Sequence, residues 1–240
     1  MVEELLRAVE ASLRNLVVDR VVIGLAYTAV LLSDGRAGVA ATLLEGTGCR
    51  VHPRAGELAG RPARALAQGL LSPDPLEASL GLAVVNAVLG EDAGPSPDPV
   101  EAMRVKEGDV VGVVGYIGPL VDSLRKVARE VLVFERNRSR PGTLPDWAVE
   151  TELPRCDVVY ITGTAFANKT IERLLGLCRG RVAVVGPSTP MWAGLLERGI
   201  DYLFGARVRD PEAVLQTVSE GGGTKALFRH GLEKVALWQG

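Results

Sequence analysis

Apolar positions in the first part of the chain recur with two different periods. Within residues 2–16 they fall three or four positions apart, which is the spacing of a helix with one buried face. Residues 20–32 are instead rich in Val, Ile, Tyr and Thr, residues 33–36 have turn composition, and residues 38–44 are apolar again. Two such runs around a turn predict an antiparallel hairpin.

Two further helices are expected after the hairpin, over residues 55–71 and 75–89. The segment between them ends in Asp74, which can cap the second helix, and Pro75, which suits its first position. The first 92 residues therefore predict a small α+β domain, built from a helix, a hairpin and two more helices.

The composition changes after this region. Residues 91–99 carry three prolines among polar residues, a composition that no helix interior tolerates. We therefore place an inter-domain connection here, with one domain over residues 1–92 and a second over residues 105–240.

After the connection the pattern changes to short, Val-rich runs without alternation. They cover residues 109–115, 131–135, 157–162, 182–186 and 202–205. A loop and a helix-like segment follow each of the first four runs. Strands covered on both faces have this composition, and the repeated alternation of strand and helix predicts an α/β domain with a Rossmann-like, doubly wound parallel sheet.

Composition and charge narrow the class of protein. With 47% hydrophobic residues, 23% charged residues and three Cys, the chain is neither a disordered protein nor a disulfide scaffold, and a net charge of -2 provides no overall basic surface for nucleic acid. The longest apolar stretch, residues 21–32, falls short of the ~20 residues that cross a bilayer, and the acidic start is unlike a secretory signal. We expect a cytoplasmic protein with a small-molecule ligand and no nucleic-acid or membrane partner; a homodimer stays open.

Candidate chemistry lies where the strands end, because ligands of open parallel sheets bind beyond the carboxyl ends of the strands. Gly115, Tyr116 and Gly118 follow the first run, and only two glycines fit the dinucleotide fingerprint, so nucleotide binding and a tight turn are both open. Glu135 ends the second run twenty residues after Gly115, about where dinucleotide and S-adenosylmethionine binders place a ribose-binding carboxylate. A solvated strand end is the alternative.

The next two strand ends are denser in polar groups. Residues 162–170 read Thr-Gly-Thr-Ala-Phe-Ala-Asn-Lys-Thr, and residues 186–190 read Gly-Pro-Ser-Thr-Pro. Asn168 or Thr170 can cap the following helix, but capping accounts for one residue, so the surplus favours a ligand. Three glycines at residues 221–223 are either a mobile connector or an anion-binding loop.

Metal ligation and covalent catalysis have weaker support. Cys49 and His52 form the single short-spaced pair of soft ligands, on a loop after the hairpin, and are weak metal candidates. Cys156 and Cys178 lie in apolar surroundings, where buried thiols are common. No Gly-x-Ser-x-Gly segment is present, so whether the protein is an enzyme stays open.

The loops after the strands carry a family resemblance. The Thr-Gly-Thr and Gly-Pro-Ser-Thr segments, the Gly115 loop and the late triple glycine resemble the "putative heavy-metal chelation" family, whose function is unknown. Tyr27 and Asn86 lie in a first half that resembles the domain preceding it there. The resemblance implies an enolase N-terminal-like domain followed by a Rossmann-like domain, with a site in the cleft between them.

The combined reading is a small-molecule site in this cleft. Its candidate residues are Tyr27, Asn86, Gly115, Tyr116, Gly118, Glu135, Thr162, Gly163, Thr164, Asn168, Gly186, Pro187, Ser188 and Thr189. Neutral donors and acceptors of this kind suit a heteroaromatic or nucleotide-like ligand, or an anionic metal chelate. The two functions left open are a binding protein linked to heavy-metal chelation or metallo-cofactor handling, and a methyltransferase-like enzyme that uses S-adenosylmethionine or a nucleotide.

Overall fold

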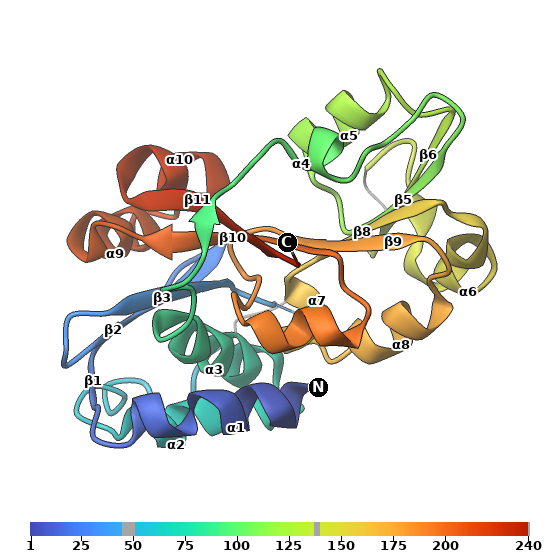
Figure 1. Ribbon diagram of the computed structural model, residues 1–240. Coiled ribbons are helices and arrows are strands. Elements are labelled where there is room, and N and C mark those ends of the chain that lie inside the picture. Colours follow the sequence, from blue (N-terminus) through green and yellow to red (C-terminus); the bar gives the residue numbers. More distant parts are fainter. Residues whose placement is uncertain (45–50, 137–139, 240) are drawn as a thin grey trace.

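A computed structural model of the chain describes residues 1–44, 51–136 and 140–239 (Figure 1). Cys49 lies outside the described residues. No helix in these ranges is both long enough and apolar enough to cross a membrane.

The first part of the chain forms a three-stranded antiparallel sheet with helices packed on it. The strands follow the order β1-β2-β3. The elements are α1 (Val2–Leu13), β1 (Val18–Ile23), β2 (Tyr27–Leu32), β3 (Ala37–Ala41), α2 (Ala63–Ala67), the 3-10 helix η1 (Gln68–Leu71) and α3 (Pro75–Ala87).

This part differs from expectation in two places. The single strand expected over residues 20–32 is two strands, because the chain turns at Gly24, whose N–H donates to Tyr27 O at 2.9 Å. A Cβ at Gly24 would stand 2.4 Å from Val218 O, so the turn also fits closely against a distant helix. The helix expected over residues 55–71 is confined to α2 and η1.

Helix α3 begins as the sequence predicts and lies at the centre of the fold. The Asp74 carboxylate accepts from the N–H groups of Leu76 and Glu77 at 2.8 and 3.1 Å, and Pro75 takes the first helical position. Side chains around most of its circumference are buried. It packs against β3 on one side and against the second part of the chain on another.

The second part of the chain forms an eight-stranded sheet in the order β4-β11-β10-β9-β8-β5-β6-β7. The strands from β10 to β7 in this order are parallel, whereas β11 is antiparallel to both of its neighbours. The strands are β4 (Gly94–Pro95), β5 (Val110–Val114), β6 (Glu130–Glu135), β7 (Leu144–Pro145), β8 (Val158–Thr162), β9 (Arg181–Val185), β10 (Tyr202–Val208) and β11 (Leu232–Trp238).

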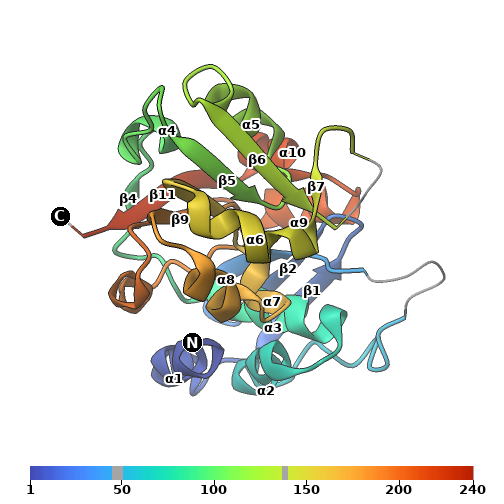
Figure 2. The ribbon, with the colours of Figure 1, turned by 90° about the vertical axis from the view of Figure 1, so that its right-hand side faces the viewer.

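Helices cover both faces of this sheet. Figures 1 and 2 show α4 and α5 on one face and α6, α7 and α8 on the other, where the first part of the chain also packs. The helices are α4 (Pro99–Ala102), α5 (Gly118–Leu124), η2 (Asp146–Ala148), α6 (Val149–Glu152), η3 (Leu153–Arg155), α7 (Thr164–Ala167), α8 (Ile171–Leu177), η4 (Ala193–Arg198), α9 (Pro211–Ser219) and α10 (Thr224–His230). The expected α/β class, with a small α+β layer and a mostly parallel doubly wound sheet, is confirmed.

Both edges of the large sheet are closed by very short strands. Strands β4 and β7 have two residues each, and each contains a proline, Pro95 or Pro145, which has no N–H to offer. Such edges disfavour pairing with another chain.

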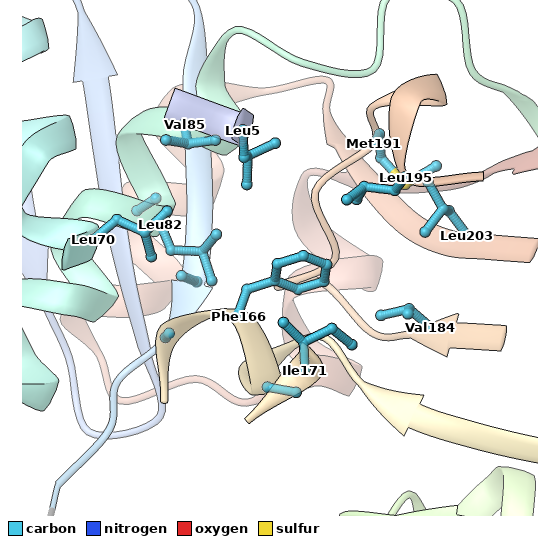
Figure 3. Close-up of a cluster of buried hydrophobic side chains, with 14 of the residues drawn as sticks. Leu5, Leu70, Leu82, Val85, Phe166, Ile171, Val184, Met191, Leu195 and Leu203 are labelled. Carbon is cyan, nitrogen blue, oxygen red and sulfur yellow. The ribbon is translucent and has the colours of Figure 1, made fainter. Parts of the chain in front are cut away.

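One apolar core joins the two parts of the chain. Leu5 of α1 and Leu82 of α3 belong to the same buried cluster as Phe166 of α7 and Leu195 of η4 (Figure 3). The segment that connects the two parts is also held against the large sheet, because the guanidinium of Arg207 in β10 donates to the carbonyls of Gly90 and Ala93. The division into domains 1–92 and 105–240 stays a prediction.

Gly38 provides a test of this packing. A Cβ at Gly38 of β3 would stand 2.2 Å from Ala83 O and 2.3 Å from Ala87 N on α3. We expect Gly38→Ala to lower the free energy of unfolding by about 1–3 kcal/mol, because the added methyl group forces the backbones apart. Urea denaturation followed by circular dichroism measures this. The control is Gly176→Ala in α8, which has open space for a Cβ; equal effects of the two substitutions would contradict the close contact.

Candidate functional site

Four loops with polar residues lie side by side at one edge of the parallel sheet. Glu135 ends β6, Gly115 follows β5, Thr162 ends β8 and Gly186 follows β9, and these strands are consecutive neighbours in the order β6-β5-β8-β9. We call this row the polar band. Its members are Gly115, Tyr116, Glu135, Thr162, Gly163, Thr164, Gly186, Ser188 and Thr189.

At the β6 end, the band is organised around Tyr116. Its backbone N–H donates to Glu135 Oε2 at 2.9 Å, which fixes the first two loops to each other. A Cβ at Gly118 would lie 3.4 Å from the Tyr116 ring, so this glycine leaves room for the ring. The guanidinium of Arg140 lies over the same ring, 4.5 Å from its centroid.

The second and third loops are held by close contact. Gly115 has φ of +87°, which few other residues adopt, and its missing Cβ would lie 2.8 Å from Thr162 Cγ2. Thr164 Oγ1 donates to Thr162 Oγ1 at 3.2 Å. These two hydroxyl groups therefore lie at the centre of the band.

The fourth loop joins the band to the first part of the chain. A Cβ at Gly163 would lie 2.4 Å from Thr189 N, so the third and fourth loops meet backbone to backbone. Gly186 has φ of +114° and starts the turn through Pro187, in which Thr189 N donates to Gly186 O at 2.9 Å. The buried Ser188 Oγ accepts from Ala41 N of β3 at 2.8 Å.

Two buried polar atoms beside this junction have no hydrogen-bond partner in the part of the chain that the structure describes. Asn86 Nδ2 donates to Val39 O of β3 at 2.9 Å, and Val39 lies two residues before Ala41, which binds Ser188. Asn86 Oδ1 has no hydrogen-bond partner among the described residues. The same holds for Thr189 Oγ1, although Thr189 is only 2% exposed. Buried polar atoms are nearly always paired, so this pair calls for a ligand group or ordered water.

Tyr27 lies in a different environment. Its ring belongs to the apolar cluster that β2 and β3 form with α9 and α10. Its hydroxyl is 2.7 Å from Thr224 Oγ1, directly after the triple glycine, and burial raises the pKa of this phenol. Tyr27 thus ties the first part of the chain to α10, and its expected role in ligand binding stays a prediction.

Asn168 and Lys169 serve the turn that ends α7. Asn168 Oδ1 accepts from the hydroxyl and the N–H of Thr170 at 2.6 and 3.1 Å. Lys169 has φ of +59°, and its ammonium donates to Ala167 O at 2.9 Å and to Ser72 O. Burial lowers the pKa of Lys169. The Asn168 carbonyl oxygen and the Lys169 ammonium are therefore bound to protein groups, and Asn168 as a ligand-binding residue stays a prediction.

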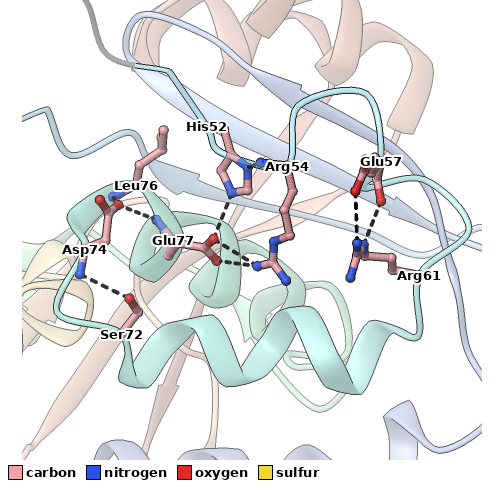
Figure 4. A network of polar contacts seen from close by, with 8 residues as sticks. All are labelled: His52, Arg54, Glu57, Arg61, Ser72, Asp74, Leu76 and Glu77. Atoms are coloured by element: carbon pink, nitrogen blue, oxygen red, sulfur yellow. Dashed lines mark hydrogen bonds and ion pairs between the residues drawn. The ribbon is translucent and has the colours of Figure 1, made fainter.

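His52, the described member of the expected metal pair, belongs to an ion-pair network (Figure 4). Its Nδ1 accepts from Arg54 N at 3.2 Å, and its Nε2 lies 3.2 Å from Glu77 Oε1. The Arg54 guanidinium binds both Glu77 oxygens, at 2.9 and 3.0 Å. The carboxylate beside His52 is thus paired with an arginine, an arrangement that does not favour a cation.

The described thiols do not fit a metal either. Burial raises the pKa of Cys156 to about 12 and that of Cys178 to about 11. Their Sγ atoms donate to the carbonyls of Glu152 and Leu174. Since the thiolate is the form that binds metal, both are poor ligands at neutral pH. Across the described ranges, no three His, Cys, Asp or Glu side chains gather in a group that could hold a metal ion.

Two family models, both described as "Putative heavy-metal chelation", match the chain, one over residues 98–237 and one over residues 6–89. The chain belongs to this family. The resemblance carried by the loops is thereby confirmed.

Similar proteins extend this finding. An uncharacterized protein of Methanocaldococcus jannaschii is 29% identical over 160 residues, which are 59% of this chain and 59% of that protein, so the match spans less than two thirds of the relative. A protein with unknown function from the same family, from Desulfitobacterium hafniense, has a crystal structure with a TM-score of 0.85 at 28% identity, covering 98% of both chains. Another, from Pyrococcus horikoshii, has a TM-score of 0.81 at 22% identity over 99% of both chains and supports the fold alone.

Ser188 tests the junction between the band and β3. In Ser188→Ala the N–H of Ala41 loses its acceptor, so we expect the free energy of unfolding to fall by about 1–3 kcal/mol. The matched control is Ser33→Ala, since Ser33 Oγ also accepts from a backbone N–H, that of Val17 at 3.2 Å, but at the surface. Water replaces that acceptor, and the control should change stability by no more than about 0.5 kcal/mol. Chemical denaturation measures the free energy of unfolding of both variants. Equal losses of stability in Ser188→Ala and Ser33→Ala would contradict the buried junction.

The two described thiols provide a pH-dependent test. Because the pKa values of Cys156 and Cys178 lie above the ordinary ~8.5, little thiolate is present at pH 8 in the folded protein. We expect alkylation by iodoacetamide at pH 8 to be more than about tenfold slower in native than in urea-unfolded protein, and to accelerate as pH approaches 11. Peptide mass spectrometry resolves each cysteine. Equal native and unfolded rates would show that burial does not suppress the thiolate.

Proposed function

We propose that this protein binds a small organic molecule at the polar band, and that the molecule is a metal-chelating compound or its metal complex. The observation that carries the proposal is a pair of buried atoms, Thr189 Oγ1 and Asn86 Oδ1, that have no hydrogen-bond partner among the described residues. Each unpaired atom costs about 1–3 kcal/mol, which polar groups of a ligand would offset.

The position of the band supports a ligand site. In open α/β sheets, ligands bind outside the carboxyl ends of the strands, and the band runs along those ends. Close backbone contacts at Gly115 and Gly163 hold its loops in fixed positions, so the hydroxyl groups of Thr162 and Thr164 are arranged before any ligand binds.

The chemistry of the band favours an organic ligand over a bare ion. Its central groups are neutral hydroxyls, and the amide of Asn86 lies at its junction with β3; such groups suit the oxygen and nitrogen atoms of an organic molecule. The soft side chains of the described part of the chain do not fit direct ligation, since His52 faces the Glu77–Arg54 pair and the two thiols stay protonated. A metal would therefore arrive inside a chelate.

Thr189→Val tests the proposal, since valine keeps the side-chain volume and removes the hydroxyl. Thermal-shift titrations would use citrate, Fe³⁺–citrate, Zn²⁺ alone, nucleotides and S-adenosylhomocysteine, together with native mass spectrometry of untagged protein to detect co-purified molecules. We expect a chelator or its complex to stabilise the wild type, and Thr189→Val to weaken that binding about tenfold. Without ligand, this variant should be no less stable than the wild type, because Thr189 Oγ1 has no hydrogen-bond partner in the described ranges to lose.

Thr217→Val is the matched control. Thr217 is also buried, but its Oγ1 donates to Ala213 O at 2.7 Å within α9. This variant should lose stability and keep the ligand affinity. Stabilisation by bare Zn²⁺ alone would contradict the chelate, a shift with S-adenosylhomocysteine alone would support the methyltransferase-like alternative, and unchanged affinity in Thr189→Val would contradict the band as the site.

A further inference from the structure

Arginines flank the segment that follows β6, although the chain as a whole carries a net charge of -2. Arg136 and Arg140 belong to the segment between β6 and β7, and Arg125 caps the C-terminal end of α5. None of the three was among the residues expected to form the site.

The three arginines differ in their partners. Arg136 Nε lies 3.1 Å from Asp146 Oδ2, so a nearby carboxylate neutralises its charge. Neither Arg125 nor Arg140 forms an ion pair with any carboxylate of residues 1–44, 51–136 or 140–239, and both are exposed. Within the described ranges, these two guanidinium groups beside the segment between β6 and β7 therefore have no carboxylate partner.

Local contacts bring these two groups to the same loop. Arg125 Nη2 lies 3.8 Å from the position that a Cβ would take at Gly142. Thr143 Oγ1 donates to Arg140 O at 2.8 Å, which stabilises the loop that carries Arg140. Arg140 is thus part of this loop, and Arg125 reaches it from the end of α5.

Tyr116 connects this charge to the band. The Arg140 guanidinium lies over the Tyr116 ring, 4.5 Å from its centroid, and a guanidinium stacked in this way can still donate hydrogen bonds in its own plane. Glu135 is the carboxylate of the band at this end, and one of its oxygens accepts from the Tyr116 N–H.

We propose that the ligand of the band carries an oxyanion group, a phosphate or a carboxylate, and that Arg140 and Arg125 bind this group beside Tyr116. Guanidinium groups bind such oxyanions through paired N–H donors. The inference rests on the proposed function, since it names the chemical class of the same ligand. Two sources of the oxyanion, phosphate esters and polycarboxylates, share this chemistry and are separated by the probes below.

Calorimetric titration of the full chain with pyrophosphate and, separately, with citrate tests the inference. We expect at least one probe to bind, with affinity that falls as salt is raised, and Arg140→Gln and Arg125→Gln each to weaken it about tenfold. Arg14→Gln, at the exposed end of α1, is the control and should bind as the wild type does. Preference for pyrophosphate or for citrate identifies the source of the oxyanion.

Failure of this inference is separable from failure of the proposed function. If neither probe binds the wild type, or if the two arginine variants bind as tightly as Arg14→Gln, the oxyanion site is overturned. The thermal-shift comparison of Thr189→Val with Thr217→Val reports on the other end of the band and is unaffected by that outcome. Circular dichroism of the arginine variants, whose side chains are exposed, verifies that they fold.

Discussion

The apolar core shared by the two parts of the chain is the constraint on which the rest of the structure depends. It presses α3 against both β3 and α7, so that the free edge of β3 arrives at the carboxyl end of β9. There Ser188 and Asn86 bind backbone groups of Ala41 and Val39. If that packing shifted, the end of the band at Ser188 would lose its contact with β3. The β6 end would keep its structure, because Tyr116 and Glu135 hold it within the large sheet. The band is thus assembled from one end that is local to the large sheet and another that exists only through long-range packing.

The two ends of the band also differ in chemistry. Neutral hydroxyl and amide groups dominate where the first part packs, and guanidinium groups flank the opposite end. A ligand with one polar organic portion and one oxyanion would match this gradient along its length. A metal held inside such a ligand would be consistent both with the family's description and with the described His and Cys side chains, which do not suit a bare metal.

Sequence patterns predicted the features that depend on neighbouring residues. Asp74 and Pro75 start α3 because capping is a local interaction, and the Val-rich runs form the parallel strands because burial on both faces sets their composition. The turn at Gly24 was missed because it depends on the distant α9, and β11 was missed because it returns antiparallel beside β10. Glycine and hydroxyl residues at the strand ends could be named in advance. Which of them have partners could not, since Thr170 satisfies Asn168 whereas nothing described satisfies Thr189 Oγ1.

The central claim is that the ligand lies along the carboxyl ends of β6, β5, β8 and β9. A crystal structure of the protein as purified, with anomalous data collected at the absorption edges of the metals found in it, tests this most directly. The account predicts density for an organic molecule that reaches Thr189 at one end and Arg140 at the other, with any anomalous peak inside that molecule. An anomalous peak ligated directly by His52 and Glu77, with water alone along the band, would contradict it.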